Sequence, residues 1–589
     1  MKRTHTCGEL TKKELQKEAT LCGWVHTRRD HGGLVFIDLR DRYGVTQVVF
    51  DPSHNKEVHK NAEHLGREFV LQVKGHVRMR PAGMANSKLI TGEIELLADS
   101  LEILNRAETP PFEIDDRNVA AEELRLKYRY LDLRRPTMQS HLLLRHKAMQ
   151  AVREFMSSQS FMEIETPMLV KTTPGGARVF KAPSRTHPGT FFSLPESPQI
   201  YKQLLMVSGC DRYFQMARCM RDEDLRADRQ CEFTQIDLEM SFVDMDDVLA
   251  IGEGIIKHVF KKVLSVDIPT PFQKMTFHDA MTKYGSDKPD LRFGLELVEV
   301  TDIVKHSDFG VFKSVVDKKG RVFCLKAPGC GNFSRGEIEE MIDIAKLHKL
   351  PGLAWMKAEN GKLESNIAKY FSEALQKQLI TAIDAKDGDL LLFSADQYEK
   401  AANALGQVRL HLGRKLNLIK DGQWKFLWVV DFPMYEWNDE ANQWAARHHI
   451  FTRPHDDDWD KLETNPAAVR GKLYDIVLNG VELSSGSIRI HSKDMQERVL
   501  KVIGLTYEEA TKRFDFLLEA FKYGAPPHGG MAIGFDRLVA LMGGQNDIRE
   551  FIAFPRNKST DNPLDGSPQP WTPEFLKDYS LKLEIVQKK

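Results

Sequence analysis

A densely charged segment between two strand-forming runs, residues 218–230, constrains the fold of this chain more than any other feature. The run DRYFQMARCM leads into it and CEFTQIDLEMSF follows it, and their aromatic and apolar residues are typical of strands. Four arginines and four acids stand in the segment, and such residues are almost never buried without partners. The pattern therefore predicts two strands joined by a charged loop.

Two residues of this loop are candidates for binding a ligand. Arg221 and Glu223 are separated by Asp222, so they should project from one face of an extended chain. Arginine offers planar, paired donors that suit phosphate oxygens, and a carboxylate accepts hydrogen bonds from an amine. Spacing alone leaves open the alternative that the loop is solvated and its charges compensate one another.

A glycine-rich segment near the C-terminus is the second candidate. Residues 529–534 read GGMAIG, and glycine lets a backbone approach a ligand closely. Arg537 follows in the first turn of an apolar helix, where a cation is unfavourable unless an anion neutralises it. The segment indicates an anion site, with a tight turn packed on a sheet as the alternative.

Two acids and a basic residue form the third candidate cluster. Asp475 and Glu482 lie in or beside strand-like runs, and Arg489 follows seven residues after Glu482. Two neighbouring carboxylates can share Mg²⁺, which takes oxygen ligands and keeps waters when it bridges to phosphates. The adjacent pair at 448–449, both histidines, is more often structural than ligating.

The N-terminal region, residues 20–105, contains five short β-rich runs separated by turn signals. That number of strands in so short a stretch is typical of the five-stranded oligonucleotide-binding (OB) barrel. Arg29, Phe36 and Gln47 stand in or next to these runs, and an exposed aromatic beside Arg and Gln suits an unpaired base. By pattern alone, a core position for Phe36 is the favoured alternative.

Breaks in composition divide the rest of the chain. Residues 106–124 hold six acids and a proline pair and read as a linker. Residues 295–420 change to helix–strand alternation with few clusters of reactive side chains and read as an inserted domain. At roughly 100–200 residues per domain, a chain of 589 residues should contain several domains.

Composition leaves the partner open. Lys and Arg number 83 and Asp and Glu 84, a formal net charge of −1, so there is no basic excess pointing to nucleic acid. The start MKRTHTCGEL lacks a secretory signal, and no stretch approaches the ~18 apolar residues of a membrane span. Seven scattered cysteines without CxxC spacing fit a reducing compartment, so we expect a cytoplasmic protein with no membrane association.

Several of these segments together resemble a known family. MEIETPML with the helix before it, MRDEDLRADRQCEFTQID and HGGMAIGFDRL resemble motifs 1, 2 and 3 of class II aminoacyl-tRNA synthetases. PESPQIYKQLLMVSG and LRLKYRYLDLRR resemble the aspartyl type in its bacterial form. The resemblance extends from residue 1 to about residue 560, and the class I signatures HIGH and KMSKS are absent.

The resemblance implies a multidomain α+β protein. Its expected parts are a five-stranded OB barrel that binds an anticodon, an antiparallel catalytic sheet with flanking helices, and an inserted α/β domain. It also implies a homodimer formed through the helix and strand of motif 1. The expected boundaries are 1–105 for the barrel, 106–130 for a linker or hinge, 131–294 for the first catalytic part, 295–420 for the insertion, and 421–589 for the second catalytic part with a C-terminal extension.

The resemblance further implies the chemistry and the residues that perform it. L-Aspartate would react with ATP, with Mg²⁺, to give aspartyl-adenylate and pyrophosphate, and tRNA would then accept the aspartyl group. Arg221 and Arg537 would be catalytic, with Asp475 and Glu482 on the metal. ATP would contact Arg221, Asp222, Glu223, Gln230, Glu482, Gly534, Phe535, Asp536 and Arg537. Aspartate would contact Ser197, Gln199, Ile200, Tyr201, Lys202, Arg221, Gln235, Asp237, His448 and Arg489.

Two features bear on variation within the family. The usual Thr-Pro-Glu-Gly-Ala-Arg pattern has Gly175 in place of its glutamate, so another group must compensate for that carboxylate or the loop closes differently. His31, commonly leucine in forms strict for tRNA(Asp), and Gly83 resemble the non-discriminating form, which also charges tRNA(Asn). Arg29, Phe36 and Gln47 would contact the anticodon.

Alternatives of other classes remain at this point. A strictly discriminating aspartyl enzyme shares every motif except those at His31 and Gly83. A lysyl or asparaginyl relative shares the barrel and motifs, but a lysine pocket should be acidic rather than lined by Arg489, Lys202 and His448. An RNA-binding paralogue without ligase activity should lose the phosphate arginines, yet Arg221 and Arg537 are both present.

Overall fold

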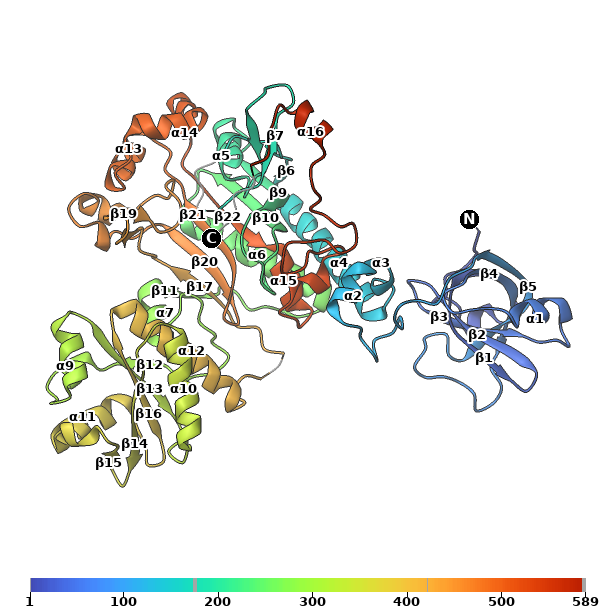
Figure 1. The fold of residues 1–589 in the computed structure, drawn as a ribbon, viewed down its shortest axis with the longest axis horizontal. Coiled ribbons are helices and arrows are strands. Elements are labelled where there is room, and N and C mark those ends of the chain that lie inside the picture. Colours follow the sequence, from blue (N-terminus) through green and yellow to red (C-terminus); the bar gives the residue numbers. More distant parts are fainter. Residues whose placement is uncertain (1, 173–176, 421, 585–589) are drawn as a thin grey trace. The chain divides into compact units, whose positions relative to one another are not determined.

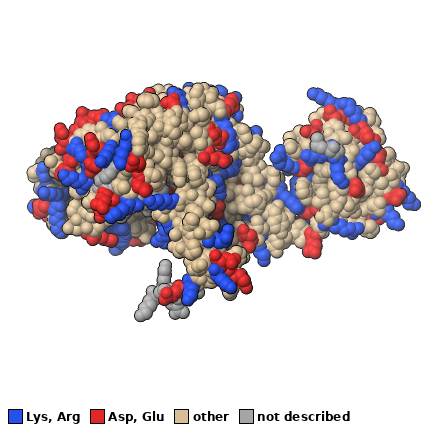
Figure 2. Space-filling view, turned by 90° about the horizontal axis from the view of Figure 1, so that it is seen from above, with Lys and Arg blue, Asp and Glu red and all other residues tan. Residues whose placement is uncertain are grey.

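The protein is described from a computed structural model covering residues 2–172, 177–420 and 422–584 (Figure 1). The chain divides into two compact units. Unit 1 comprises residues 1–145 and 549–569, and unit 2 comprises residues 146–548 and 570–589. Figure 2 shows basic and acidic side chains interspersed on the visible face, in keeping with the balanced composition.

Unit 1 contains a closed five-stranded barrel with strand order β1-β2-β3-β5-β4. All neighbouring strands are antiparallel except β3 and β5, which are parallel. Alternate residues point inward, so Val35, Ile37 and Leu39 of one strand enter the core. The predicted OB barrel is confirmed. Its elements are β1 (Glu18–His31), β2 (Leu34–Arg40), β3 (Val45–Phe50), α1 (Lys56–Ala62), β4 (Val70–Met79) and β5 (Ile94–Asn105).

The segment expected to be a linker is partly helical. Backbone without helix or strand continues to Ala121, and helices α2 (Glu122–Lys127) and α3 (Arg129–Asp132) follow it. Asp132, which is fully buried, accepts hydrogen bonds from Arg125, Arg129 and Arg135. Three arginines that follow the acidic segment therefore surround one buried carboxylate.

Unit 2 is built on an eight-stranded sheet of order β11-β17-β20-β21-β22-β10-β9-β6. Only the two edge pairs, β11 with β17 and β6 with β9, are parallel. The expected antiparallel catalytic sheet is confirmed, and β9 and β10 are the two strands predicted around the charged loop. The strands are β6 (Met162–Glu163), β9 (Arg212–Met220), β10 (Glu232–Ser241), β11 (Gln273–Thr276), β17 (Phe426–Val430), β20 (Leu473–Leu478), β21 (Val481–Ile488) and β22 (His528–Gly534).

Helices and small hairpins flank this sheet. The helices α4 (Pro136–Ser158) and α6 (Met245–Leu264) are the longest helices in the described part of the chain. The shorter helices are α5 (Gln199–Val207), α7 (Phe277–Tyr284), α13 (Lys493–Val502), α14 (Tyr507–Ala520) and α15 (Phe535–Met542), and the hairpins pair β7 (Lys181–Pro183) with β8 (Phe191–Ser193) and β18 (Tyr435–Asn438) with β19 (Gln443–Ala446). In the C-terminal tail, α16 (Pro573–Asp578) is a short helix.

The inserted region forms a second sheet, of order β12-β13-β16-β14-β15, which is antiparallel throughout. Alternate strand residues enter two cores, one shared with α10 and α12 and the other with α8, α9 and α11. Helices therefore cover both faces of this sheet (Figure 1). Its elements are β12 (Leu297–Glu299), α8 (Thr301–Val304), α9 (Gly310–Asp317), β13 (Arg321–Ala327), α10 (Arg335–Leu347), β14 (Ala354–Glu359), β15 (Lys362–Glu364), α11 (Glu373–Ile383), β16 (Leu390–Asp396) and α12 (Tyr398–Lys415).

Within the described residues, no helix has both the length and the apolar character needed to cross a membrane.

Gly530, on β22, tests the packing between β22 and β10. A Cβ atom at this position would lie 2.2 Å from the carbonyl oxygen of Leu238 and from the Glu239 carboxylate. Because a strand carbonyl cannot move aside, we expect Gly530→Ala to destabilise unit 2 by about 1–3 kcal/mol, the usual cost of overpacking. Thermal unfolding should show a lower melting temperature.

Gly534→Ala is the matched control on the same strand, because its Cβ would meet nothing closer than 3.5 Å. Equal melting temperatures for the two variants would contradict the packing argument.

Candidate active site

A cavity of about 680 Å³ opens over the central strands of the large sheet. Its lining comes from α5, the loop between β9 and β10, the β20–β21 hairpin, and the junction of β22 with α15. These segments carry all three clusters of charged residues predicted from the sequence. The fold therefore gathers those clusters into one site.

Four charged side chains lie together at the floor of this cavity and are almost fully buried. Lys202, Asp237 and Arg489 line the cavity, and Glu239 pairs with both cations beneath them. The Lys202 ammonium lies 3.0 Å from Asp237 and 3.3 Å from Glu239. Arg489 donates through Nε to Glu239 at 2.9 Å and through Nη2 to the same carboxylate at 3.3 Å. None of the four side chains is more than 2% exposed. We call these four residues the floor cluster.

The two acids of the floor cluster differ in their preferred state. Burial raises the pKa of Asp237 above its ordinary value, against the opposing charge of Lys202. Burial also acts on Glu239, but the charges of Arg489 and Lys202 outweigh it and lower the pKa of this carboxyl. Asp237 Oδ1 has no hydrogen-bond partner among the described residues, so this atom can still accept from a ligand.

Two neutral side chains accept from the other arm of Arg489. Nη1 contacts Ser487 Oγ at 2.7 Å and the ring of His449. Burial, together with the nearby Arg489 charge, lowers the pKa of His449 well below its ordinary value. Burial and Arg447 lower the pKa of His448, which also lines the cavity, to about 4. Both rings are therefore neutral at physiological pH.

The charged loop presents Arg221 to the cavity without an acidic partner among the described residues. Its guanidinium lies over the ring of Phe233, 5.2 Å from the centroid. Its Nε atom is buried and has no hydrogen-bond partner among the described residues. Charge compensation within the loop holds for Arg229, which pairs with Glu223 at 3.6 Å. Arg218, at the end of β9, pairs with Glu232 of β10 at 3.2 Å.

Arg537 lies at another edge of the cavity. Its Nη1 donates to the backbone oxygen of Glu482 at 2.6 Å, and its Nη2 lies 3.3 Å from Asp228. Asp536, which precedes it, accepts from the backbone N–H of Thr234 at 2.7 Å and so joins α15 to β10. The prediction that Arg537 stands in the first turn of a helix is confirmed.

Asp475 and Glu482 face the cavity from neighbouring strands. Burial and then the charge of Glu482 raise the pKa of Asp475 well above its ordinary value. Asp475 Oδ1 is buried and has no hydrogen-bond partner among the described residues. The described residues contain no group of three or more His, Cys, Asp and Glu that could hold a metal unaided. A cation here would need further oxygen ligands from a substrate or water.

The structure brings most of the predicted site residues to this cavity. Those lining it are Ser197, Gln199, Lys202, Arg221, Glu223, Gln230, Gln235, Asp237, His448, Asp475, Glu482, Arg489, Gly534, Asp536 and Arg537. Gln199 and Lys202 are three residues apart on α5 and share its inner face, as helical geometry requires.

Four predicted residues lie elsewhere. Ile200 is buried in a hydrophobic cluster, and Tyr201 packs near Phe516, because both point away from the face of α5 that carries Lys202. Asp222 does not line the cavity, and its backbone N–H donates to Arg178. Phe535 is fully buried. Gly175 lies outside the described residues.

Sequence reasoning missed His449, which lines the cavity, and Glu239, which pairs with two of the cations that line it. Glu239 follows Asp237 by two positions on one strand, so the alternation of β10 already put both on the same face. His449 was noticed only as the neighbour of His448, and nothing in the sequence distinguishes their roles.

The three residues expected to contact an anticodon lie together on the barrel. Arg29 pairs directly with Phe36 across β1 and β2. The Arg29 guanidinium donates to Gln47 at 3.2 Å and to Asp38 at 3.0 Å. Phe36 alternates with the inward-facing Val35 and Ile37, so the core position favoured by pattern alone is wrong.

His31 and Gly83 are both exposed on the barrel unit. His31 is the last residue of β1. Gly83 has a φ of 80°, in the left-handed region that favours glycine, and nothing lies within 4 Å of where its Cβ would be. The positive φ angle at position 83 therefore accounts for the glycine, because there is room for a side chain.

Comparison with known families agrees with this architecture. The model of the tRNA synthetases class II (D, K and N) matches residues 121–558, and that of the OB-fold nucleic acid binding domain matches residues 19–104. The chain belongs to the class II tRNA synthetases of the D, K and N type. The family expected from the three motifs is thereby confirmed.

Close relatives are similar over their whole length. The chain is 50% identical to an Aspartate--tRNA(Asp/Asn) ligase of Caldanaerobacter subterraneus, covering 99% of each chain. It is also 50% identical to the enzyme of the same name from Desulfatibacillum aliphaticivorans, over 99% of this chain and 98% of the relative. An Aspartate--tRNA ligase of Ruminiclostridium cellulolyticum is also 50% identical, over 96% of each.

Solved structures share the fold at low identity. Asparaginyl-tRNA synthetase from Pyrococcus horikoshii, complexed with asparaginyl-adenylate, matches with a TM-score of 0.59 and 18% identity over 94% of this chain and 98% of that one. Aspartyl tRNA synthetase from Entamoeba histolytica matches with a TM-score of 0.57 and 19% identity over 94% and 92%.

The floor cluster makes a prediction about stability. Glu239→Gln removes one of two acids that compensate two buried cations, so we expect a loss of about 3–5 kcal/mol in the free energy of unfolding of unit 2. Glu232→Gln is a matched control on the same strand. The partner of Glu232, Arg218, is half exposed, so the cost should stay below about 1 kcal/mol. Similar urea midpoints for both variants would contradict this account.

Proposed function

We propose that this protein attaches L-aspartate to tRNA in two steps, through an aspartyl-adenylate formed from ATP. The observation that carries the proposal is the buried guanidinium of Arg489, which lines the cavity beside Lys202. Its Nη1 donates only to neutral acceptors among the described residues, Ser487 and His449. A carboxylate at that point would make stronger, charge-assisted hydrogen bonds.

The floor cluster also suits the other end of an amino acid. Asp237 Oδ1 is a buried acceptor without a partner among the described residues, and an α-ammonium group would satisfy it. Asparagine would bind less well, because its neutral amide would replace the charge-assisted hydrogen bonds that a carboxylate makes to Arg489 Nη1. The full-length similarity to aspartate ligases supports the same choice of amino acid.

In the first step, a carboxylate oxygen of aspartate attacks the α-phosphorus of ATP. The bond between that phosphorus and the oxygen bridging to the β-phosphate breaks, and the electron pair leaves with inorganic pyrophosphate. Arg221 would contact the α-phosphate and Glu223 the adenine side, and Arg537 would hold the γ-phosphate. Such a transfer needs positioning and charge neutralisation rather than a strong base. In the second step, a hydroxyl of the tRNA 3′-terminal ribose takes the aspartyl group and AMP leaves.

Mg²⁺ would be held by Asp475 and Glu482. Burial and then the charge of Glu482 raise the pKa of Asp475, and its Oδ1 has no hydrogen-bond partner among the described residues. A divalent cation would offset both effects. The ion would supply charge neutralisation to the phosphates. Oxygens of ATP and water would complete its shell.

The barrel would read the anticodon through Arg29, Phe36 and Gln47. Phe36 and Arg29 are cross-strand neighbours on the outer surface, which suits stacking of one unpaired base and hydrogen bonding to its edge. The exposed positions of His31 and Gly83 on the barrel unit support the further proposal that tRNA(Asp) and tRNA(Asn) are both accepted. The names of two relatives that are 50% identical carry the same double specificity.

We further propose a cytoplasmic homodimer with the domain division expected from the sequence. All seven cysteines are free thiols, which suits a reducing compartment. The exposed apolar side chains of Met162, Leu169 and Phe191 lie in and around the motif 1 strand and the β7–β8 hairpin, and a second copy would cover them.

Exchange of pyrophosphate into ATP tests the amino-acid assignment. The wild type should catalyse exchange with aspartate and not with asparagine or lysine. Arg489→Gln should lower kcat/KM for aspartate by about 100-fold, because a buried charge-assisted contact is lost. Arg218→Gln, on the exposed end of β9, should change it less than about twofold, as exposed pairs contribute little. Exchange that does not depend on aspartate, with or without tRNA present, would contradict the proposed function.

Charging assays with tRNA(Asp) and tRNA(Asn) test whether the protein accepts both tRNAs. We expect similar efficiencies for tRNA(Asp) and tRNA(Asn). His31→Leu should favour tRNA(Asp) by about 5- to 100-fold, corresponding to ~1–3 kcal/mol for one base contact. A wild-type preference above about 100-fold for tRNA(Asp) on the same scale would identify a strictly discriminating enzyme instead.

A further inference from the structure

A second cavity, of about 620 Å³, adjoins the active-site cavity. One wall is common to both, and Arg537 stands in it. The shared residues are Asp228, Gly480, Val481, Arg537 and Ile548. The opposite wall comes from α12 of the inserted domain and from the segment that leads into that domain.

The charges around this second cavity favour an anion. Three arginines line it against two aspartates, and both aspartates are already engaged. Asp290, only 2% exposed, holds Arg292 through hydrogen bonds to Nη2 at 2.6 Å and to Nε at 3.0 Å. Asp228 lies 3.3 Å from Arg537. The guanidinium groups of Arg292 and Arg537 are thus fixed in place before any ligand arrives.

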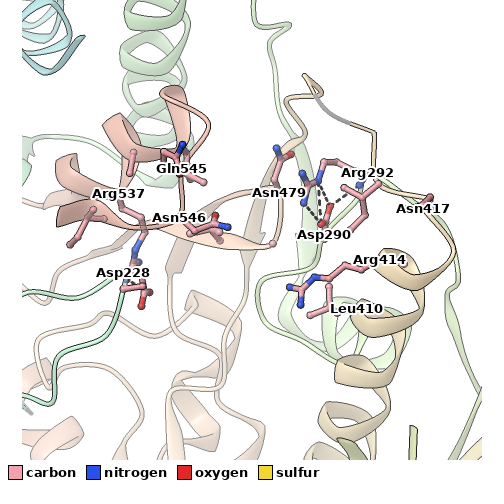
Figure 3. A pocket seen from close by; sticks show the side chains of 18 residues that line it. Asp228, Asp290, Arg292, Leu410, Arg414, Asn417, Asn479, Arg537, Gln545 and Asn546 are labelled. Carbon is pink, nitrogen blue, oxygen red and sulfur yellow. Dashed lines mark hydrogen bonds and ion pairs between the residues drawn. The ribbon is translucent and has the colours of Figure 1, made fainter. Parts of the chain in front are cut away.

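Arg414, in the last turn of α12, differs from the other two arginines. Its side chain is exposed and makes no hydrogen bond or ion pair with any residue in the described part of the chain. Figure 3 shows Arg537 and Asp228 on one side of the cavity, Arg414 across from them, and Asn546 between the two sides. An anion bound at the shared wall would therefore face the guanidinium of Arg414 across the second cavity.

We propose that this cavity binds inorganic pyrophosphate as it leaves the active site, with Arg414 as its contact on the inserted domain. The inference rests on the proposed function, in which Arg537 holds the γ-phosphate. The leaving group then already lies at the shared wall when its bond to the α-phosphorus breaks. Departure through that wall leaves the floor cluster occupied by the adenylate and carries a multiply charged anion toward Arg414.

A purely structural role for Arg414 makes a different prediction. A cation in the last turn offsets the partial negative charge at the C-terminal end of a helix. Loss of that effect lowers the melting temperature and leaves the affinity for pyrophosphate unchanged. The two roles can therefore be separated by measuring both quantities on one variant.

The test compares full-length wild type with Arg414→Gln in aspartate-dependent exchange at varied pyrophosphate and saturating Mg²⁺. The KM for pyrophosphate should rise about fivefold, the value of one partly exposed ionic contact, and Arg414→Glu should raise it further. The KM for aspartate should stay unchanged, because the floor cluster is untouched. Arg335→Gln is the matched control, since Arg335 is also exposed on the inserted domain but lies outside the cavity.

An unchanged KM for pyrophosphate in both Arg414 variants, with or without a lower melting temperature, overturns the proposal. Calorimetric titration of Mg²⁺-pyrophosphate into the same proteins separates this result from a failure of the proposed function. If the wild type lacked aspartate-dependent exchange, the proposed function would fall. Weaker pyrophosphate binding by Arg414→Gln would still support the site, and equal binding would refute it.

Discussion

The floor cluster is the constraint on which the rest of unit 2 depends. Two cations and two acids lie under the active-site cavity with almost no exposure, and an unpaired charge there would cost several kcal/mol. Lys202 comes from α5, the acids from β10, and Arg489 from the end of β21. The need to pair these charges therefore fixes α5, β10 and β21 relative to one another, although β10 and β21 are not adjacent in the sheet. β22 runs between those strands, and only a glycine at position 530 leaves room for the Glu239 carboxylate.

The arginines proposed to meet substrate share a second property. Each has a neutral contact: Arg221 lies over an aromatic ring, Arg537 donates to a backbone oxygen, and one arm of Arg489 donates to a hydroxyl and a neutral imidazole. Arg537 and Arg489 also pair with Asp228 and Glu239, respectively. A neutral partner holds one arm of a guanidinium in position and leaves that arm without a carboxylate. The site is thus organised for anions before they bind, which is how enzymes lower the cost of stabilising developing charge.

Local patterns in the sequence carried most of the fold and much of the site. The charged loop between two strands, the helix start at Arg537 and the barrel all follow from short-range periodicity and turn chemistry. The direction of Phe36 was not predicted, because register decides which face of a strand meets the core. Ile200 and Tyr201 were assigned to the site as part of a motif, whereas helical geometry admits only Gln199 and Lys202. The crowding of Asp475 and Glu482 depends on pairing with an irregularity after Ile476, which no local signal indicates. The order of strands in the inserted sheet likewise depends on contacts between distant residues.

The insertion begins and ends at neighbouring strands. β11 pairs in parallel with β17, although the whole inserted domain separates them along the chain. For a flexible chain, closing a loop of that length has a high entropic cost, and distant pairings of this kind slow folding. The inserted domain has its own sheet and one hydrophobic core of its own, and its second core continues into α7, β17 and β20 of the catalytic part. Once folded, it therefore brings its two ends close together. Early folding of the insertion would thereby convert this distant pairing of the catalytic sheet into a nearly local one.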